Sequence, residues 1–134
     1  MYETIISETY LDFLGHMNNA RYLELFEQAR WEYITQAGYG LSKIRELQQG
    51  PVILEVNLRF VKELKEREKV KISMELAEYK GKISKIKQQM FNDKNEVCAE
   101  LMVTAGLFDL KTRRLINPNA EWSKALGIKS ESIV

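Results

Sequence analysis

Residues 19–37 read NARYLELFEQARWEYITQA and decide the fold, because they form one long helical pattern without a break. Apolar and aromatic side chains spread over most of its circumference; they are Tyr22, Leu23, Leu25, Phe26, Ala29, Trp31, Tyr33 and Ala37. A helix with so wide an apolar surface is surrounded by protein rather than lying on the outside of a domain. Asn18 or Asn19 can cap its start. Gly38 or Gly40 can end it, which gives a length of about 27 Å.

Around this helix the sequence alternates with a period of two, as expected of strands. The alternating segments are residues 2–10, 52–60, 70–76, 83–91 and 97–110. In the second segment the residues expected to share one face are Val52, Leu54, Val56, Leu58 and Phe60. Turns at 79–82 and 92–95 join the later strands, and a short amphipathic helix follows Pro118. This order predicts an α+β domain in which an antiparallel sheet wraps around one helix.

Length and composition exclude several classes of protein. The 134 residues suit a single domain, residues 1–134, with 20 lysines and arginines against 19 acidic residues. Such a balanced charge disfavours a nucleic-acid-binding protein. One cysteine and one histidine exclude a disulfide framework and a His/Cys zinc cluster. No apolar run is long enough to span a membrane and the start lacks a signal-peptide pattern, so we expect a cytoplasmic protein.

The loop before the long helix carries the residues best suited to chemistry. Cys98 lies in a strand pattern and is expected to be an inert buried thiol, whereas Asp12 and His16 stand just ahead of the helix. A helix N-terminus offers unpaired backbone N–H groups and the positive end of the helix dipole. A carbonyl oxygen bound there would be polarised while an ionised Asp12 attacks the carbonyl or activates water. The simpler alternative makes Asp12 a turn residue that satisfies the loop backbone.

Residues 10–31, YLDFLGHMNNARYLELFEQARW, closely resemble the signature of hotdog-fold acyl-CoA thioesterases of the 4-hydroxybenzoyl-CoA thioesterase type. Their Asp-x-x-Gly-His-x-Asn-Asn-Ala-x-Tyr pattern, followed by the Glu-x-x-Arg-Trp of residues 27–31, looks most like the long-chain acyl-CoA thioesterase branch. The similarity continues more loosely through 56–60, 81–84 and 107–115. It implies a hotdog fold, with a curved antiparallel sheet of five strands around the helix. At 62–68 the chain has KELKERE where many relatives have a Pro-Leu-x-x-Gly-Asp turn, so the local pocket is expected to differ.

The resemblance also implies roles for individual residues. Asp12 matches the catalytic aspartate of the family, as nucleophile or general base, and the backbone N–H at or beside Asn19 matches its oxyanion contact. His16 either shapes the loop or touches the thioester, or it acts as the acid–base partner of Asp12. The remaining candidates for binding substrate and CoA are Gly15, Asn18, Tyr22, Arg59, Lys80, Lys82, Ser84 and Lys85. The resemblance implies no metal and no bound cofactor, with water as the second substrate.

The implied activity is hydrolysis of a medium- to long-chain acyl-CoA to a free fatty acid and CoA, with the acyl tail among Leu23, Phe26 and Phe60. One alternative is a thioesterase for acyl-carrier-protein thioesters, with the same lysines as the docking patch. Another is a non-catalytic module that binds acyl groups or CoA, which the intact loop motif disfavours. The resemblance further implies a homodimer or homotetramer with the site at the subunit interface, and neither nucleic acid nor membrane as partner. Glu27 and Arg30 are expected to form an ion pair on the helix.

Overall fold

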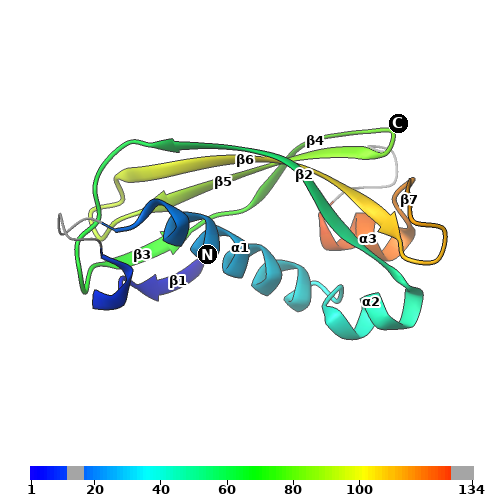
Figure 1. Ribbon diagram of the computed structural model, residues 1–134, viewed down its shortest axis with the longest axis horizontal. Helices are drawn as coiled ribbons and strands as arrows, with labels where there is room; N and C mark the ends of the chain where they lie inside the picture. Colours follow the sequence, from blue (N-terminus) through cyan, green and yellow to red (C-terminus); the bar gives the residue numbers. More distant parts are fainter. Residues whose placement is uncertain (12–16, 128–134) are drawn as a thin grey trace.

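The computed structural model describes residues 1–11 and 17–127. Within these residues, seven strands form one antiparallel sheet: β1 (Tyr2–Ile5), β2 (Gln49–Phe60), β3 (Lys69–Ile72), β4 (Glu75–Lys80), β5 (Ile83–Phe91), β6 (Val97–Asp109) and β7 (Arg114–Ile116). The helices are η1 (Glu8–Tyr10), α1 (Asn19–Gln36), α2 (Leu41–Leu47) and α3 (Ala120–Ala125). Figure 1 shows α1 on one face of the sheet, with α2 and α3 near the end of the molecule where α1 stops.

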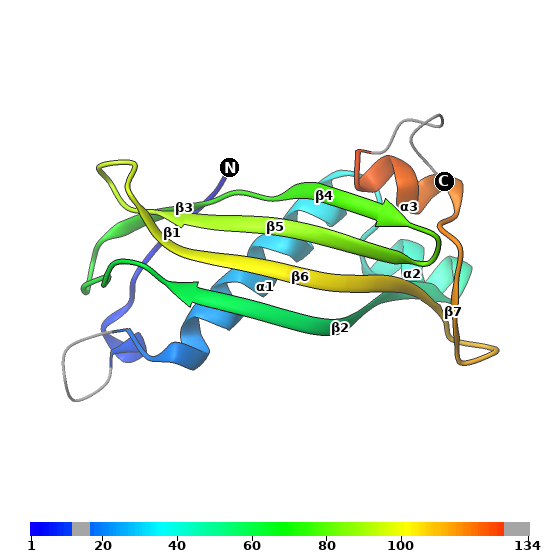
Figure 2. The same ribbon diagram turned by 90° about the horizontal axis from the view of Figure 1, so that it is seen from above.

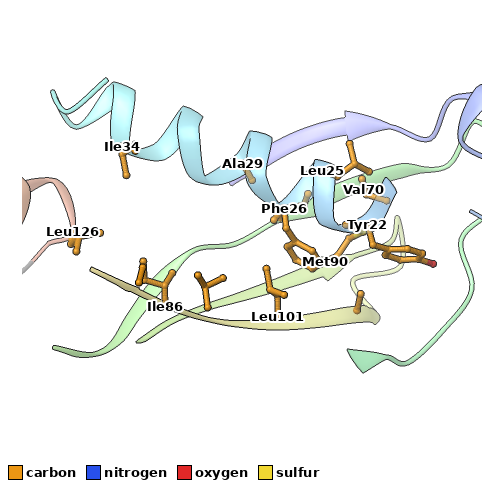
Figure 3. Close-up of a cluster of buried hydrophobic side chains, with 14 of the residues drawn as sticks. Tyr22, Leu25, Phe26, Ala29, Ile34, Val70, Ile86, Met90, Leu101 and Leu126 are labelled. Carbon is orange, nitrogen blue, oxygen red and sulfur yellow. The ribbon is translucent and has the colours of Figure 1, made fainter. Parts of the chain in front are cut away.

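The long helix predicted from the sequence is confirmed as α1. Its N-cap is Asn18, and Gly38 follows its end with φ 95°, a left-handed conformation that glycine adopts without strain. Figure 3 shows the buried side chains of α1, Phe26 and Tyr22 among them, directed at the sheet, where they meet Met90 of β5. One cluster of apolar residues therefore joins helix and sheet, and burial of that surface is the main source of stability.

The sheet has the main strand order β1-β3-β5-β6-β2, and β4 and β7 extend it by pairing with β5 and β6. A five-strand antiparallel path around one helix confirms the predicted hotdog fold, with two short strands added. Figure 2 shows that α1 crosses the sheet obliquely, starting below the end of β2 and finishing below β4. Because α1 crosses obliquely, it moves away from the edge strand β2 along its length.

Strand β2 departs from the predicted alternation at a β-bulge. The pairing with β6 shifts between Ile53 and Glu55, so that Ile53 lies opposite Ala105 and Val56 opposite Val103. Ala105 and Val103 are both buried, which places Ile53 and Val56 on the inner face of the sheet. The prediction that Val52 shares a face with Val56 is therefore wrong, because the extra residue of the bulge changes the phase of the strand.

Other differences from the predicted elements are local. The first strand ends at Ile5 and gives way to η1, and the segment 70–76 is divided between β3 and β4. Helix α2 and strand β7 did not appear in the sequence analysis, whereas the strand over residues 83–91 and the helix after Pro118 are confirmed. Among the described residues, no helix is both long and apolar enough to cross a membrane.

Candidate active site at the start of helix α1

The first turn of α1 leaves one backbone amide without a partner among the described residues. The side-chain Oδ1 of Asn18 accepts the N–H of Ala20 at 2.9 Å, and the carbonyl of Asn18 accepts the N–H of Arg21 at 2.9 Å. The intervening N–H of Asn19 is too close to the start of α1 to find an acceptor within the helix. The positive end of the helix dipole therefore coincides with an amide that can bind an anionic oxygen.

Three predicted site residues, Asp12, Gly15 and His16, lie outside the described residues. The chain on either side of them is held at the start of α1. Leu11 and Met17 form an isolated antiparallel bridge, and the N–H of Asn18 donates to the carbonyl of Tyr10 at 2.7 Å.

Tyr22, a predicted substrate-binding residue, lies one turn into α1 and is buried. Its ring meets that of Phe60, at the end of β2, edge to face with centroids 5.0 Å apart. Burial and the negative potential of Cys98 raise the pKa of Tyr22 to about 12, against a smaller lowering by the backbone N–H of Leu64. The phenol is therefore neutral at physiological pH and serves as packing and as a hydrogen-bonding group rather than as a base.

The predicted CoA-binding lysines lie on the β4–β5 hairpin. Lys80 and Lys82 flank its turn at Gly81 and are exposed, whereas Lys85 lies opposite Glu78 in the strand register. That acidic neighbour partly offsets the charge of Lys85 for an anionic ligand. Ser84 is fully buried and its hydroxyl donates to the carbonyl of Ala105 at 3.1 Å, so its hydrogen-bonding capacity is used inside the fold.

One chain does not bring all the predicted residues together. The β4–β5 hairpin lies near α3, at the opposite end of the sheet from the start of α1 (Figures 1 and 2). Arg59 lies at the correct end, but it precedes the inward-facing Phe60 and points to the face of the sheet away from α1. There its guanidinium is 4.0 Å from the carboxylate of Glu100.

A cavity of about 230 Å³, which the sequence did not predict, lies between the second half of α1 and the sheet. Its lining is mostly apolar: Glu27, Arg30, Trp31, Ile34, Pro51, Ile53, Met74, Ile86, Ala105 and Trp122. The guanidinium of Arg30 donates to Oε1 of Gln88 at 2.9 Å, and Nε2 of Gln88 donates to the carbonyl of Phe26 at 3.1 Å. Burial lowers the pKa of Arg30, and the negative charge of Glu27 partly offsets that effect.

Two predictions about this region need correction. Arg30 hydrogen bonds to Gln88 across the helix–sheet interface, and Glu27 acts on it through charge alone, not through the predicted direct ion pair. Phe26 is completely buried in the core and is not part of the lining of this cavity, whereas Leu23 and Phe60 are exposed. The bulge of β2 and the oblique course of α1 create the cavity, and neither has a clear sequence signal.

Comparison with known proteins identifies the family. The model of the thioesterase-like superfamily matches residues 8–126, which includes nearly every described element. The chain belongs to the thioesterase-like superfamily. The resemblance seen in residues 10–31 is thereby confirmed.

Individual known proteins resemble this chain over most of its length. The long-chain acyl-CoA thioesterase FadM of Escherichia coli K12 is 25% identical over 118 residues, which cover 87% of this chain and 89% of FadM. A Staphylococcus aureus protein solved in complex with CoA superposes with a TM-score of 0.88 at 16% identity, covering 94% of this chain and 80% of that one. The probable thioesterase YbaW of Escherichia coli superposes with a TM-score of 0.83 at 22% identity, covering 99% and 98%. The structures show that the thioesterase-like fold is shared.

Proposed function

We propose that this thioesterase-like protein hydrolyses acyl-CoA thioesters, with medium- to long-chain fatty acyl groups as its preferred substrates. The observation that carries the proposal is the amide of Asn19 at the positive end of α1, which has no partner among the described residues and stands seven residues after Asp12 in a matching family signature. The long-chain acyl-CoA thioesterase FadM, which is similar over most of both chains, supports a fatty acyl substrate.

In the proposed reaction the thioester carbonyl oxygen accepts the N–H of Asn19, which stabilises the negative charge that develops on that oxygen. Asp12 either takes a proton from water while the water oxygen attacks the carbonyl carbon, or attacks that carbon itself. In both routes the C–S bond breaks and CoA leaves as a thiolate that then takes up a proton. The second route passes through an acyl anhydride, which water hydrolyses to the free acid. His16 positions the loop and the thioester.

The site is proposed to be completed by a second copy of the chain. Strand β2 is a twelve-residue edge strand. Its exposed apolar side chains and those just after it are Ile53, Leu54, Val56, Phe60 and Val61. A long apolar edge is a template for strand pairing, so we place a homodimer interface along β2. A two-fold axis there reverses the second copy and turns its Lys80 and Lys82 toward the end where α1 of the first copy begins. These lysines and Arg59 would then meet the phosphates of CoA.

An acyl-carrier-protein thioester remains the second candidate substrate, because the exposed Lys80 and Lys82 also suit an acidic docking partner. We also propose a cytoplasmic location, where a reducing environment keeps the buried Cys98 as a free thiol. A role as a non-catalytic acyl-binding module would leave the family signature without a use.

The experiment that tests the proposed function is thiol release from benzoyl-, butyryl-, lauroyl- and palmitoyl-CoA, together with lauroyl-carrier protein as a separate arm. We expect turnover of the CoA esters, with kcat/KM highest for lauroyl- or palmitoyl-CoA. Hydrolysis of the carrier-protein thioester alone would move the second candidate ahead. A folded protein that releases thiol from none of these substrates would refute a thioesterase function.

A further inference from the structure

The cavity beside α1 contains a charged group in an apolar lining. Arg30 lies on the wall of the cavity, with Trp31, Ile34 and Ile86 among its apolar neighbours. A guanidinium offers five N–H donors, and the one acceptor that the described residues provide for Arg30 is Oε1 of Gln88. A partly buried cation with unused donors is costly unless a ligand or water supplies acceptors.

Exposed apolar side chains also lie between the start of α1 and the cavity. Leu23 and Phe60 are exposed near the first turns of the helix. Val56 and Ile53 follow on the inner face of β2, and Ile53 is part of the cavity lining. Figure 2 shows that α1 starts beneath the end of β2 and then moves away from it. Arg30 follows Asn19 by eleven residues, a separation of about 16 Å along the helix axis. An extended lauroyl chain has about this reach.

The charges at the cavity favour one kind of terminal group on a bound acyl chain. A terminal methyl group placed beside Arg30 would displace water and supply no acceptor. A carboxylate would supply acceptors but would also face the negative charge of Glu27, which is part of the same lining. A hydroxyl group avoids both penalties, since it can accept from Arg30 and donate to Glu27.

From these observations we propose that the cavity receives the far end of the acyl group, and that Arg30 selects acyl chains carrying a hydroxyl group at that end. The inference rests on the proposed thioesterase function and specifies its substrate class further. Arg30 would then be a specificity-determining residue that contacts the acyl chain about 16 Å along the helix from the oxyanion site at Asn19.

The test compares matched CoA esters in the wild-type protein and in Arg30→Met. The substrates are lauroyl-CoA, ω-hydroxylauroyl-CoA, dodecanedioyl-CoA with its terminal carboxylate, and butyryl-CoA, which is too short to reach the cavity. A hydrogen bond to a charged group corresponds to about a ten- to hundred-fold difference in kcat/KM. We expect wild type to prefer ω-hydroxylauroyl-CoA over lauroyl-CoA by that factor. In Arg30→Met we expect the preference to vanish while butyryl-CoA hydrolysis persists.

Loss of folding is separated from loss of specificity in two ways. The ratio of kcat/KM for two substrates of one variant does not depend on the fraction of folded protein. The double variant Arg30→Met/Gln88→Leu removes both partners of the Arg30–Gln88 hydrogen bond, so that Oε1 of Gln88 is not left unpaired. Arg45→Met, at an exposed position on α2, is the matched control and should keep the wild-type preference.

Each outcome decides the inference. A wild-type preference for lauroyl-CoA or dodecanedioyl-CoA would overturn it, as would an unchanged preference for the hydroxylated chain in Arg30→Met. In either case, hydrolysis of butyryl-CoA by wild type would leave the proposed thioesterase function standing. Failure of wild type to hydrolyse any of the four esters would overturn both.

Discussion

Replacing Asn19 by proline removes the backbone N–H from the proposed site and keeps the local backbone conformation. Proline lacks a backbone N–H and is favoured at the first position of a helix, which Asn19 occupies. The residue before a proline must be extended, and Asn18 already has φ −60° and ψ 138°. The cap from Asn18 to the N–H of Ala20 does not involve the deleted group. Asn19→Pro should therefore fold normally while losing the oxyanion donor.

The expected cost of Asn19→Pro follows from the loss of a single oxyanion hydrogen bond. Such a loss lowers kcat by about 10²- to 10³-fold, or about 2.7–4 kcal/mol in the activation barrier. The free energy of unfolding should stay the same or rise by about 0.4–1 kcal/mol, because proline restricts the unfolded chain. Thiol release from an acyl-CoA gives kcat, and urea unfolding gives the stability.

Asn19→Ala is the matched control for Asn19→Pro, because it deletes the exposed side chain and keeps the amide. We expect it to retain most of the wild-type kcat. Wild-type turnover by a stable Asn19→Pro would refute the assignment of this amide as the oxyanion donor. Equal losses in the two variants would instead assign the function to the side chain of Asn19.

Three further predictions concern the surface. Leu54→Lys places a charge on the exposed apolar edge of β2 and should convert a dimer into a monomer, as measured by light scattering; an unchanged mass would exclude this edge as the interface. Lys80→Ala/Lys82→Ala should raise KM for a CoA ester several-fold with kcat unchanged, and this rise in KM should shrink at high salt. A KM that does not depend on salt would indicate that the phosphates of CoA bind elsewhere. Lys62 hydrogen bonds to Glu96 and, with Asn92, lowers its pKa, so Lys62→Met should raise that pKa in an NMR titration. The pKa of Glu96 is lowered in the folded protein. Any stability that wild type gains over Lys62→Met is therefore present above the ordinary glutamate pKa, and it disappears as the pH falls through the lowered value. A difference in the free energy of unfolding that persists in acid would contradict this.

The parts of the fold that the sequence predicted correctly have strong periodic patterns. The apolar surface of α1 and the alternation over β5 persist for many residues, and both elements were placed within a residue or two of their ends. The bulge at Ile53 was not predictable, because the alternation looks regular when read from Val52 onward and the shift appears only against β6. Helix α2 was missed because its seven residues are too short to show a period.

In the candidate site, too, the features set by local sequence were predictable and those set by tertiary packing were not. The capping role of Asn18 and the helix start at Asn19 follow from local sequence, and the structure confirms both. The cavity at Arg30 depends on the angle between α1 and the sheet, which is set by tertiary packing. The spacing of Glu27 and Arg30 suggested a local ion pair, whereas Gln88, distant in sequence, provides the actual partner.

The measurement that tests the central claim most directly is thiol release from lauroyl-CoA by wild type and by Asp12→Asn. The substitution keeps the shape of the side chain and removes its charge, and circular dichroism verifies that the variant is folded. Wild type should hydrolyse the ester, and Asp12→Asn should lose about 10²- to 10⁴-fold in kcat, the contribution of a general base. A folded Asp12→Asn that turns over lauroyl-CoA at the wild-type rate would contradict the account.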